Sequence, residues 1–160
     1  MKEYKFKFRG KEIDTGKWVY GGLFKEPAPP QCFEKALEDK YWIVYPNPRY
    51  MPDWNLPYEM VRTDVNPKTI GQYTELKDEN GKEIYSGDII EFSYDMFVGN
   101  FDTFVAKGKV VFEEGAFYVE VFENERTTKD EAYLLYSINL DTIEVIGNIY
   151  DNPELLEEGE

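Results

Sequence analysis

The residue types that most often carry enzymatic chemistry are scarce in this sequence. Its 160 residues include no histidine and a single cysteine, Cys32. Histidine is the commonest general base and metal ligand, so its absence removes every Ser-His and Cys-His nucleophile. Cys32 has no imidazole to activate it, and the neighbouring Phe33 and Ala36 favour a packing role for its side chain. We therefore expect a protein that is not an enzyme and has no catalytic residue.

Acidic and glycine-containing segments could hold a cation or a phosphate, but their spacing fits neither ligand. The run Asp78-Glu79-Asn80-Gly81, with Asp88, has the composition of a calcium loop, yet its glycine comes too early for an EF-hand. The glycines from Gly71 to Gly87 lack the Lys-Ser/Thr pair of a phosphate loop. The chain has 32 acidic residues, so chance carboxylate pairs give glycosidase chemistry no specific support. We expect no metal and no cofactor.

Charge is distributed unevenly along the chain. The net charge is −14, residues 1–25 hold seven basic and three acidic residues, and residues 113–160 hold two basic and 14 acidic residues. Such a surface repels phosphate backbones, so we do not expect general nucleic-acid binding. The acidic segment leaves an alternative function open, in which it mimics DNA phosphates and occupies a host nucleic-acid enzyme. That function needs two rows of carboxylates, drawn from Glu113, Glu114, Glu120, Glu123 and Glu125.

The N-terminal segment has the opposite charge and alternates basic with aromatic residues. Lys5-Phe6-Lys7-Phe8-Arg9 has the period of two that is typical of a strand with one buried face. Such a strand could stack on single-stranded nucleic acid and neutralise its phosphates. The favoured interpretation is an edge strand that turns its rings inward and its lysines outward, which protects against aggregation.

Hydrophobic alternation and turn residues predict a mainly β fold. The pair Asn80-Gly81 predicts a two-residue hairpin turn with positive φ at both residues and a buried Ile84. Gly21 and Gly22 interrupt a strand, which indicates a bulge or a close backbone approach. A second hairpin is expected at Glu113-Glu114-Gly115, and short helices at 31–40 and 152–158. The expected strands cover residues 4–9, 17–24, 41–45, 58–63, 69–74, 89–92, 108–112, 116–122, 133–138 and 143–150, and residues 76–85 are expected to form strand on either side of the Asn80-Gly81 turn.

The length fits one domain over residues 1–160, with two possible subdomains. Residues 1–65 would form a β portion that begins with a hairpin. Residues 66–160 would form a small barrel of the Src-homology-3-like or OB-like kind. The sequence has no signal peptide and no apolar run of about 18 residues, so we expect a cytoplasmic protein without a membrane span.

Two long segments resemble the signatures of a known family. Residues 69–90, TIGQYTELKDENGKEIYSGDII, are similar to the central signature of the YopX family of phage and prophage proteins. Residues 145–156, VIGNIYDNPELL, are similar to its C-terminal signature. The opening of the chain also fits, through Phe6, Arg9, Trp18, Val19, Tyr20 and Gly21. The resemblance covers nearly the whole chain and implies an accessory protein of a phage or prophage that self-associates in the bacterial host cell. It supplies no catalytic residue that could be transferred.

Residues 25–65 depart from the family pattern, because they are rich in proline and aromatic residues. Prolines prevent regular structure throughout residues 46–57, and irregular loops lie on the surface. Exposed aromatic and methionine side chains are typical of interfaces, which makes Tyr50, Met51 and Trp54 the candidate interaction surface. The alternative, in which the loop buries these rings on its own sheet, stays open. The predicted function is an accessory role through a protein partner or a second copy of the chain.

Overall fold

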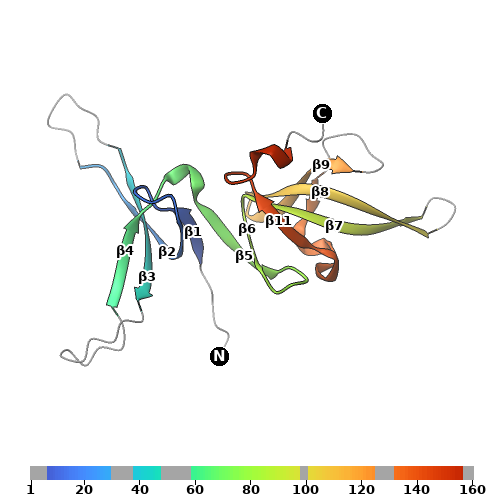
Figure 1. The fold of residues 1–160 in the computed structure, drawn as a ribbon, viewed down its shortest axis with the longest axis horizontal. Coiled ribbons are helices and arrows are strands. Elements are labelled where there is room, and N and C mark those ends of the chain that lie inside the picture. Colours follow the sequence, from blue (N-terminus) through green and yellow to red (C-terminus); the bar gives the residue numbers. More distant parts are fainter. Residues whose placement is uncertain (1–6, 30–37, 48–58, 98–100, 125–131, 157–160) are drawn as a thin grey trace. The chain divides into compact units, whose positions relative to one another are not determined.

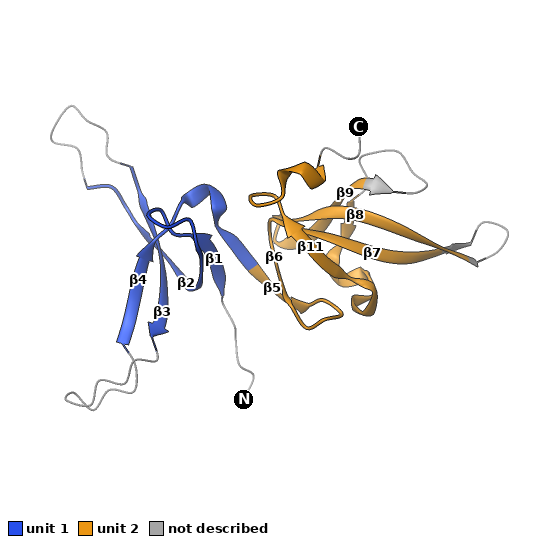
Figure 2. Cartoon of the chain, in the orientation of Figure 1, with its two compact units in different colours: residues 1–72 blue, residues 73–160 orange. Residues whose placement is uncertain are grey.

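The computed structural model describes residues 7–29, 38–47, 59–97, 101–124 and 132–156 (Figure 1). These residues are mainly β, as the sequence predicts, and their helical segments are all short 3-10 turns. The chain divides into two compact units, residues 1–72 and 73–160 (Figure 2). No helix in the described part of the chain is long and apolar enough to cross a membrane.

The two units share the strand β5 (Gly71–Lys77), whose first two residues pair with β1 and whose later residues pair with β6. All strand pairs are antiparallel, in the orders β4-β3-β2-β1-β5-β6 and β10-β9-β8-β7-β11. Unit 1 also contains β1 (Phe8–Lys11), β2 (Trp18–Glu26), β3 (Lys40–Asn47), β4 (Glu59–Asp64) and the 3-10 turn η2 (Pro67–Thr69). Unit 2 contains β6 (Glu83–Tyr85), β7 (Asp88–Phe97), β8 (Phe101–Glu113), β9 (Ala116–Asn124), β10 (Ala132–Leu134), β11 (Glu144–Asn148) and the 3-10 turns η3 (Leu135–Ser137), η4 (Leu140–Thr142) and η5 (Pro153–Leu156).

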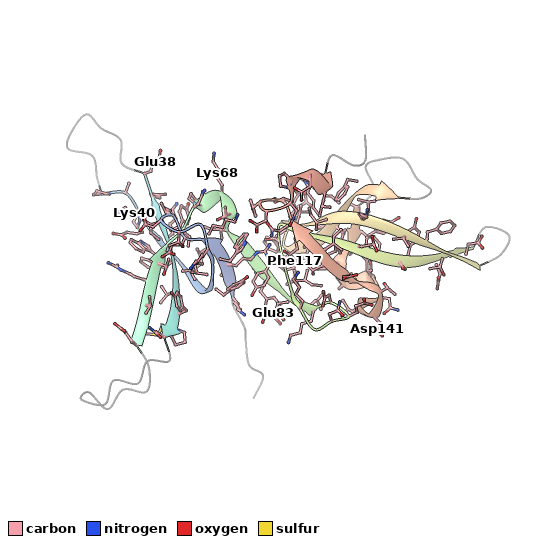
Figure 3. All side chains as sticks on the ribbon, viewed as in Figure 1. Glu38, Lys40, Lys68, Glu83, Phe117 and Asp141 are labelled. Carbon is pink, nitrogen blue, oxygen red and sulfur yellow. The ribbon has the colours of Figure 1, made fainter. Side chains whose placement is uncertain are left out.

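Unit 1 buries one face of its strands. The predicted N-terminal hairpin is present, because β1 and β2 pair with Arg9 opposite Tyr20. Ile43 on β3 lies opposite Thr63 on β4, and both side chains are buried. Successive residues of a strand point to opposite faces, so the residues between these buried positions project to the other side of the sheet. Side chains therefore extend from both faces of the strands of unit 1 (Figure 3).

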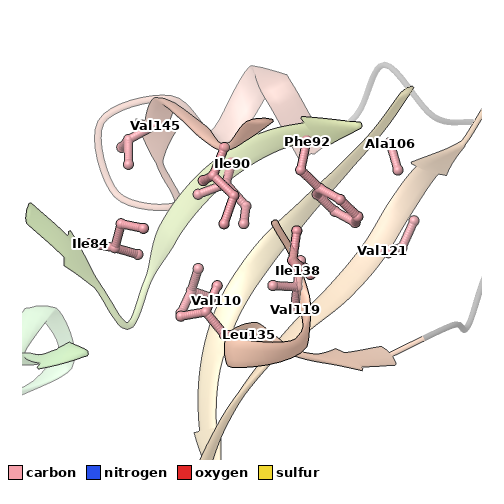
Figure 4. Close-up of a cluster of buried hydrophobic side chains, with 11 residues drawn as sticks. Ile84, Ile90, Phe92, Ala106, Val110, Val119, Val121, Leu135, Ile138 and Val145 are labelled. Atoms are coloured by element: carbon pink, nitrogen blue, oxygen red, sulfur yellow. The ribbon is translucent and has the colours of Figure 1, made fainter. Parts of the chain in front are cut away.

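Unit 2 contains a continuous apolar core (Figure 4). Alternate residues of β7, β8 and β9 point into it, as the period of two requires. The 3-10 turns η3 and η4 and the residues beside them supply Leu135, Ile138 and Ile143 to the same cluster. The buried members are Ile84, Ile90, Phe92, Ala106, Val110, Val119, Val121, Leu135, Ile138, Ile143 and Val145.

The expected small barrel is not formed by the described residues. The five-stranded sheet of unit 2 is open, with β10 and β11 at its two edges. The sequence predicts a strand over residues 133–138, but β10 ends at Leu134 and the chain turns through η3. The backbone N–H of Ile138 donates to the carbonyl of Leu135 (3.2 Å), so these groups serve a turn and not a strand ladder. The last strand is also shorter than predicted and contains a register shift between Val145 and Gly147.

The C-terminal helical turn predicted over residues 152–158 is present as a 3-10 turn over Pro153–Leu156, with proline at its first position as expected for a helical start. The other prediction covers residues 31–40, of which residues 31–37 lie outside the described part of the chain. Within the remainder, Lys40 begins β3.

The turn between β5 and β6 differs from the prediction. Gly81 has a φ of 79°, but Asn80 does not have a positive φ. The N–H of Gly81 donates to the carbonyl of Asp78, and the N–H of Asp78 donates to the carbonyl of Lys82, each at 2.9 Å. These bonds close a three-residue loop, in which only the last residue has to be left-handed. The predicted two-residue turn is therefore wrong, whereas Ile84 is fully buried as predicted.

The hairpin between β8 and β9 has a two-residue turn with positive φ at both residues, the geometry that was predicted for Asn80-Gly81. Glu113 pairs with Ala116, and the intervening Glu114 and Gly115 have φ of 49° and 85°. A residue with a Cβ pays a steric cost in this region, and asparagine tolerates it better than glutamate. We expect Glu114→Asn to raise the free energy of unfolding by about 0.5–1 kcal/mol, measured by urea denaturation. Glu113→Asn is the matched control, and an equal gain there would contradict the explanation.

Candidate functional site

An open pocket of about 510 Å³ lies in unit 2, a size that fits a ligand or a partner's side chain. Strands β7 and β8 supply one side of its lining, and Tyr133 of β10 together with the turns η3 and η4 supplies the other. Its apolar lining consists of three aromatic residues, Phe92, Tyr94 and Tyr133, together with Ile138. Its polar lining consists of Ser93, Asp95, Thr103, Ser137, Asn139 and Thr142.

The three rings pack against one another. Phe92 and Tyr94 lie two residues apart on β7, so their side chains share one face of the strand. The ring centroids of Phe92 and Tyr133 are 6.1 Å apart in an edge-to-face arrangement, and those of Tyr94 and Tyr133 are 6.2 Å apart. These separations are typical of favourable aromatic pairs. Phe92 is buried, whereas Tyr94 and Tyr133 are half-buried and present part of their surface to the pocket.

Hydrogen bonds fix the polar side of the pocket. Asp95 and Thr103 are cross-strand partners, and the Thr103 hydroxyl donates to Asp95 Oδ1 at 2.7 Å. The Thr142 hydroxyl lies 3.1 Å from the carbonyl of Ser93 and 2.8 Å from that of Asn139, and can donate to either. Asp95 is exposed and is the carboxylate of the lining. The pocket thus combines an aromatic wall with a negatively charged rim, which suits an apolar or aromatic group that has a cation beside it.

Tyr50, Met51 and Trp54, like Cys32, lie outside the described residues, so the proposed interaction surface stays a prediction. The pocket itself was missed because the predicted strands end at residue 92 and resume at residue 108, whereas β7 continues to Phe97 and β8 begins at Phe101. The alternation of Phe92, Ser93 and Tyr94 is the signal that could have extended the strand.

The acidic turn that resembles a calcium loop has a structural role. Asp78 is buried, and its carboxylate accepts hydrogen bonds from the N–H groups of Asn80 (3.0 Å), Lys82 (2.8 Å) and Val145 (3.1 Å). Asp88 is also buried and accepts from the N–H of Tyr85 at 2.7 Å. Across the described ranges, no group of three or more Cys, Asp or Glu residues is placed to hold a metal ion.

The acidic residues considered for DNA mimicry include one that is paired. Glu120 on β9 lies opposite Lys109 on β8, and their charged groups are 2.7 Å apart. Glu113 and Glu114 are exposed at the hairpin, and Glu125 lies outside the described residues. The ion pair neutralises one of the charges that two phosphate-like rows require. The mimicry function gains no specific support from this arrangement and stays a prediction.

The fold and the pocket define a mainly β protein with two compact units and a concave aromatic site in the second. A family model described as YopX protein matches residues 7–157. The chain therefore belongs to the YopX family. It is also similar to the crystal structure of protein EF1440 from Enterococcus faecalis, with 19% sequence identity over 96% of this chain and 99% of that chain and a TM-score of 0.43. No curated protein matches the sequence.

Proposed function

We propose that this YopX protein is a phage or prophage accessory protein that works in the bacterial cytoplasm by binding a protein partner or a second copy of itself. The observation that supports this function is the open pocket beside Phe92, Tyr94 and Tyr133. Protein interfaces draw most of their binding energy from a few side chains that fill such pockets. A partner's aromatic or apolar side chain would pack on Tyr94 and Tyr133, with water excluded around it.

The charge of the rim narrows the choice of occupant. Asp95 is exposed beside the rings, and its Oδ1 accepts from Thr103 while its other oxygen can accept a second donor. A lysine or arginine next to the partner's anchoring residue would therefore be favoured at this position. The function is proposed as non-enzymatic because the sequence has no histidine and the hydroxyls of Thr103 and Thr142 are engaged within the lining.

Filling the pocket tests the proposed function. We expect Thr103→Trp to weaken association at least about tenfold, because the added ring takes the place of the partner's anchoring side chain. Association is measured by affinity capture from the host lysate and, for self-association, by a concentration series in the analytical ultracentrifuge. Glu113→Trp is the control, since Glu113 is exposed at the far end of the same strand β8 and is not part of the pocket lining.

The two variants separate a pocket effect from a general effect of an added tryptophan. Normal association of Glu113→Trp together with loss in Thr103→Trp supports the pocket. Equal association of Thr103→Trp and wild type contradicts it and moves the contact elsewhere, with Tyr50, Met51 and Trp54 as the next candidates. Far-ultraviolet circular dichroism confirms that both variants are folded before they are compared.

A further inference from the structure

We propose that unit 1 carries a second binding surface, independent of the pocket, that takes single-stranded nucleic acid. This surface, the stacking face, is the open face of the four strands β1 to β4. Its central residues are Tyr20, Phe24, Lys40, Trp42 and Arg62. The N-terminal alternation of basic and aromatic residues is continued here by side chains from three further strands.

Strand register places these side chains on one face. Phe24 on β2 lies directly opposite Trp42 on β3, and Glu26 lies opposite Lys40. Trp42 lies opposite Asp64 on β4, so Arg62, two residues earlier, is on the same face. Directly paired residues share a face, as do residues two apart on a strand.

The opposite face is the buried one, and the stacking face is open over β2 to β4, whereas Arg9 on β1, opposite Tyr20, is buried. Ile43 and Val65 are fully buried on or beside the other side of the sheet. On the stacking face, Phe24 is 55% exposed, Met60 57% and Tyr20 43%. These are among the most exposed large apolar side chains of the described residues, and they come from β2 and β4, the two strands that flank β3. A contiguous apolar surface of this kind marks a binding site more often than a scattered one does.

Cations lie over the rings of this face. The Arg62 guanidinium carbon is 4.7 Å from the centroid of the Trp42 ring. Lys40, which is labelled in Figure 3, has its Nζ 5.9 Å from the centroid of the same ring. Lys7 Nζ is 5.5 Å from the ring of Tyr20. The Trp42 indole is also held by a hydrogen bond from Nε1 to Glu26 Oε2 at 2.8 Å. Aromatic planes and positive charges therefore alternate at contact distance across the sheet.

The sign of charge on the stacking face is opposite to that of the whole chain. Its exposed or half-buried cations are Lys7, Lys11, Lys40 and Arg62. Its acidic residues on the four strands are Glu26 and Asp64. The chain as a whole carries −14, and the strongly acidic residues 113–160 belong to unit 2. The stacking face is thus a local positive surface on a protein that otherwise repels polyanions.

Single-stranded nucleic acid is the occupant that uses both features. Bases stack on exposed rings, and lysine and arginine neutralise the phosphates between them. An antiparallel sheet of four strands with rings on its open face is one of the forms that such stacking takes in RNA-binding domains. A duplex hides its base faces and is read by elements that enter its grooves, which a flat ring-bearing sheet does not do. An acidic protein segment would use the cations but has no use for several stacked rings.

The proposal predicts binding that depends on both rings and charge. The probe is a fluorescein-labelled oligothymidine of about 12 nucleotides, within the site sizes of single-strand binding folds, and the readout is fluorescence anisotropy of the full chain. We expect Phe24→Ala to weaken binding about tenfold by removing one stacked base. The slope of log affinity against log salt concentration should be no steeper than about −3, because four accessible cations can neutralise no more than four phosphates.

Two charge variants form a matched pair. Arg62→Gln and Lys25→Gln each remove one positive charge, but Lys25 points to the opposite face, opposite Tyr41. We expect Arg62→Gln to lose several-fold in affinity and Lys25→Gln to bind normally. Equal losses in both variants overturn the proposal in favour of unspecific attraction, and no binding at low salt overturns it outright.

Competitors distinguish the remaining occupants. Unlabelled duplex DNA of the same length should displace the probe poorly. Polyglutamate that displaces the probe as well as unlabelled oligothymidine does, with Phe24→Ala binding normally, would assign the face to an acidic protein segment and overturn the nucleic-acid proposal. Thr103→Trp fills the pocket of unit 2 and should leave oligothymidine binding unchanged, so failure of this proposal and failure of the proposed function are separable.

Discussion

Gly21→Ala should lower the free energy of unfolding by about 3 kcal/mol, whereas Gly22→Ala should cost nothing. A Cβ at Gly21 would lie 2.2 Å from the carbonyl oxygen of Val44 and 3.1 Å from Cγ2 of Ile43. The clash is with the backbone of the paired strand β3, which cannot move aside without breaking the β2–β3 ladder. At Gly22 the nearest atom is the same carbonyl oxygen at 3.9 Å, an ordinary contact.

The two glycines provide their own control, since they are neighbours in one strand and receive the same substitution. Alanine at Gly22 should even stabilise slightly, because it lowers the entropy of the unfolded chain. Urea denaturation followed by tryptophan fluorescence reports on unit 1, which contains Trp18 and Trp42. Similar losses in the two variants would contradict the close approach at Gly21.

Asp78→Ala should destabilise the protein by about 3–4 kcal/mol. The Asp78 carboxylate is buried and accepts from three backbone N–H groups, two in its own turn and one at Val145 of β11. Removal of the carboxylate leaves the buried N–H of Val145 and the half-buried N–H groups of Asn80 and Lys82 without their acceptor, which costs more than the loss of an exposed hydrogen bond. The turn is further attached to the segment leading into β11 by the N–H of Glu79, which donates to the carbonyl of Ile143 at 2.9 Å.

Asp78→Asn distinguishes the contribution of Asp78 Oδ1 to stability from that of Oδ2. An asparagine can keep the bonds from Asn80 and Lys82 to Oδ1 but presents an N–H₂ group to the N–H of Val145, so we expect roughly half of the loss. Asp141→Ala, at an exposed position of η4, is the control and should change the free energy of unfolding by less than about 0.5 kcal/mol. Thermal or urea unfolding measures all three variants. A small effect of Asp78→Ala would show that water replaces the carboxylate.

The sequence contained enough local information to predict much of the fold. Short runs of apolar and aromatic residues bounded by turn residues identified the strands that became β2, β3, β8 and β9, because both signals are local in the sequence. Gly21 was predicted to mark a bulge or a close backbone approach. The second option is confirmed, because a Cβ at Gly21 would lie 2.2 Å from the carbonyl oxygen of Val44. The family was also recognisable from two continuous segments, since their residues form local turns and strands.

Features that depend on distant contacts were not predictable in the same way. The turn at Asn80-Gly81 was misjudged because Asp78 engages Val145, 67 residues away in sequence. The extra acceptor stabilises a three-residue loop over the two-residue turn that the dipeptide alone favours. The small barrel predicted for residues 66–160 included a strand over residues 133–138, where the 3-10 turn η3 instead directs Leu135 into the core.

The pocket was missed for a related reason. Its aromatic wall joins Tyr94 on β7 to Tyr133 on β10, and no local pattern brings these residues together. Only part of the stacking face was predictable from the sequence, because the alternation of Lys and Phe at the N-terminus concerns a single strand. The contribution of Phe24, Trp42 and Arg62 depends on the register of three strands.

The central claim is that the pocket of unit 2 is where this protein contacts another protein, and site-specific photo-crosslinking tests it most directly. A benzophenone amino acid at Thr103, on the pocket rim, is compared with the same amino acid at Glu113, exposed at the far end of β8 and outside the lining, in cells that produce the full chain. We predict a discrete crosslinked protein, or a crosslinked copy of this chain, from position 103 and none from position 113. The same crosslinks from both positions, or none from position 103, would contradict the claim.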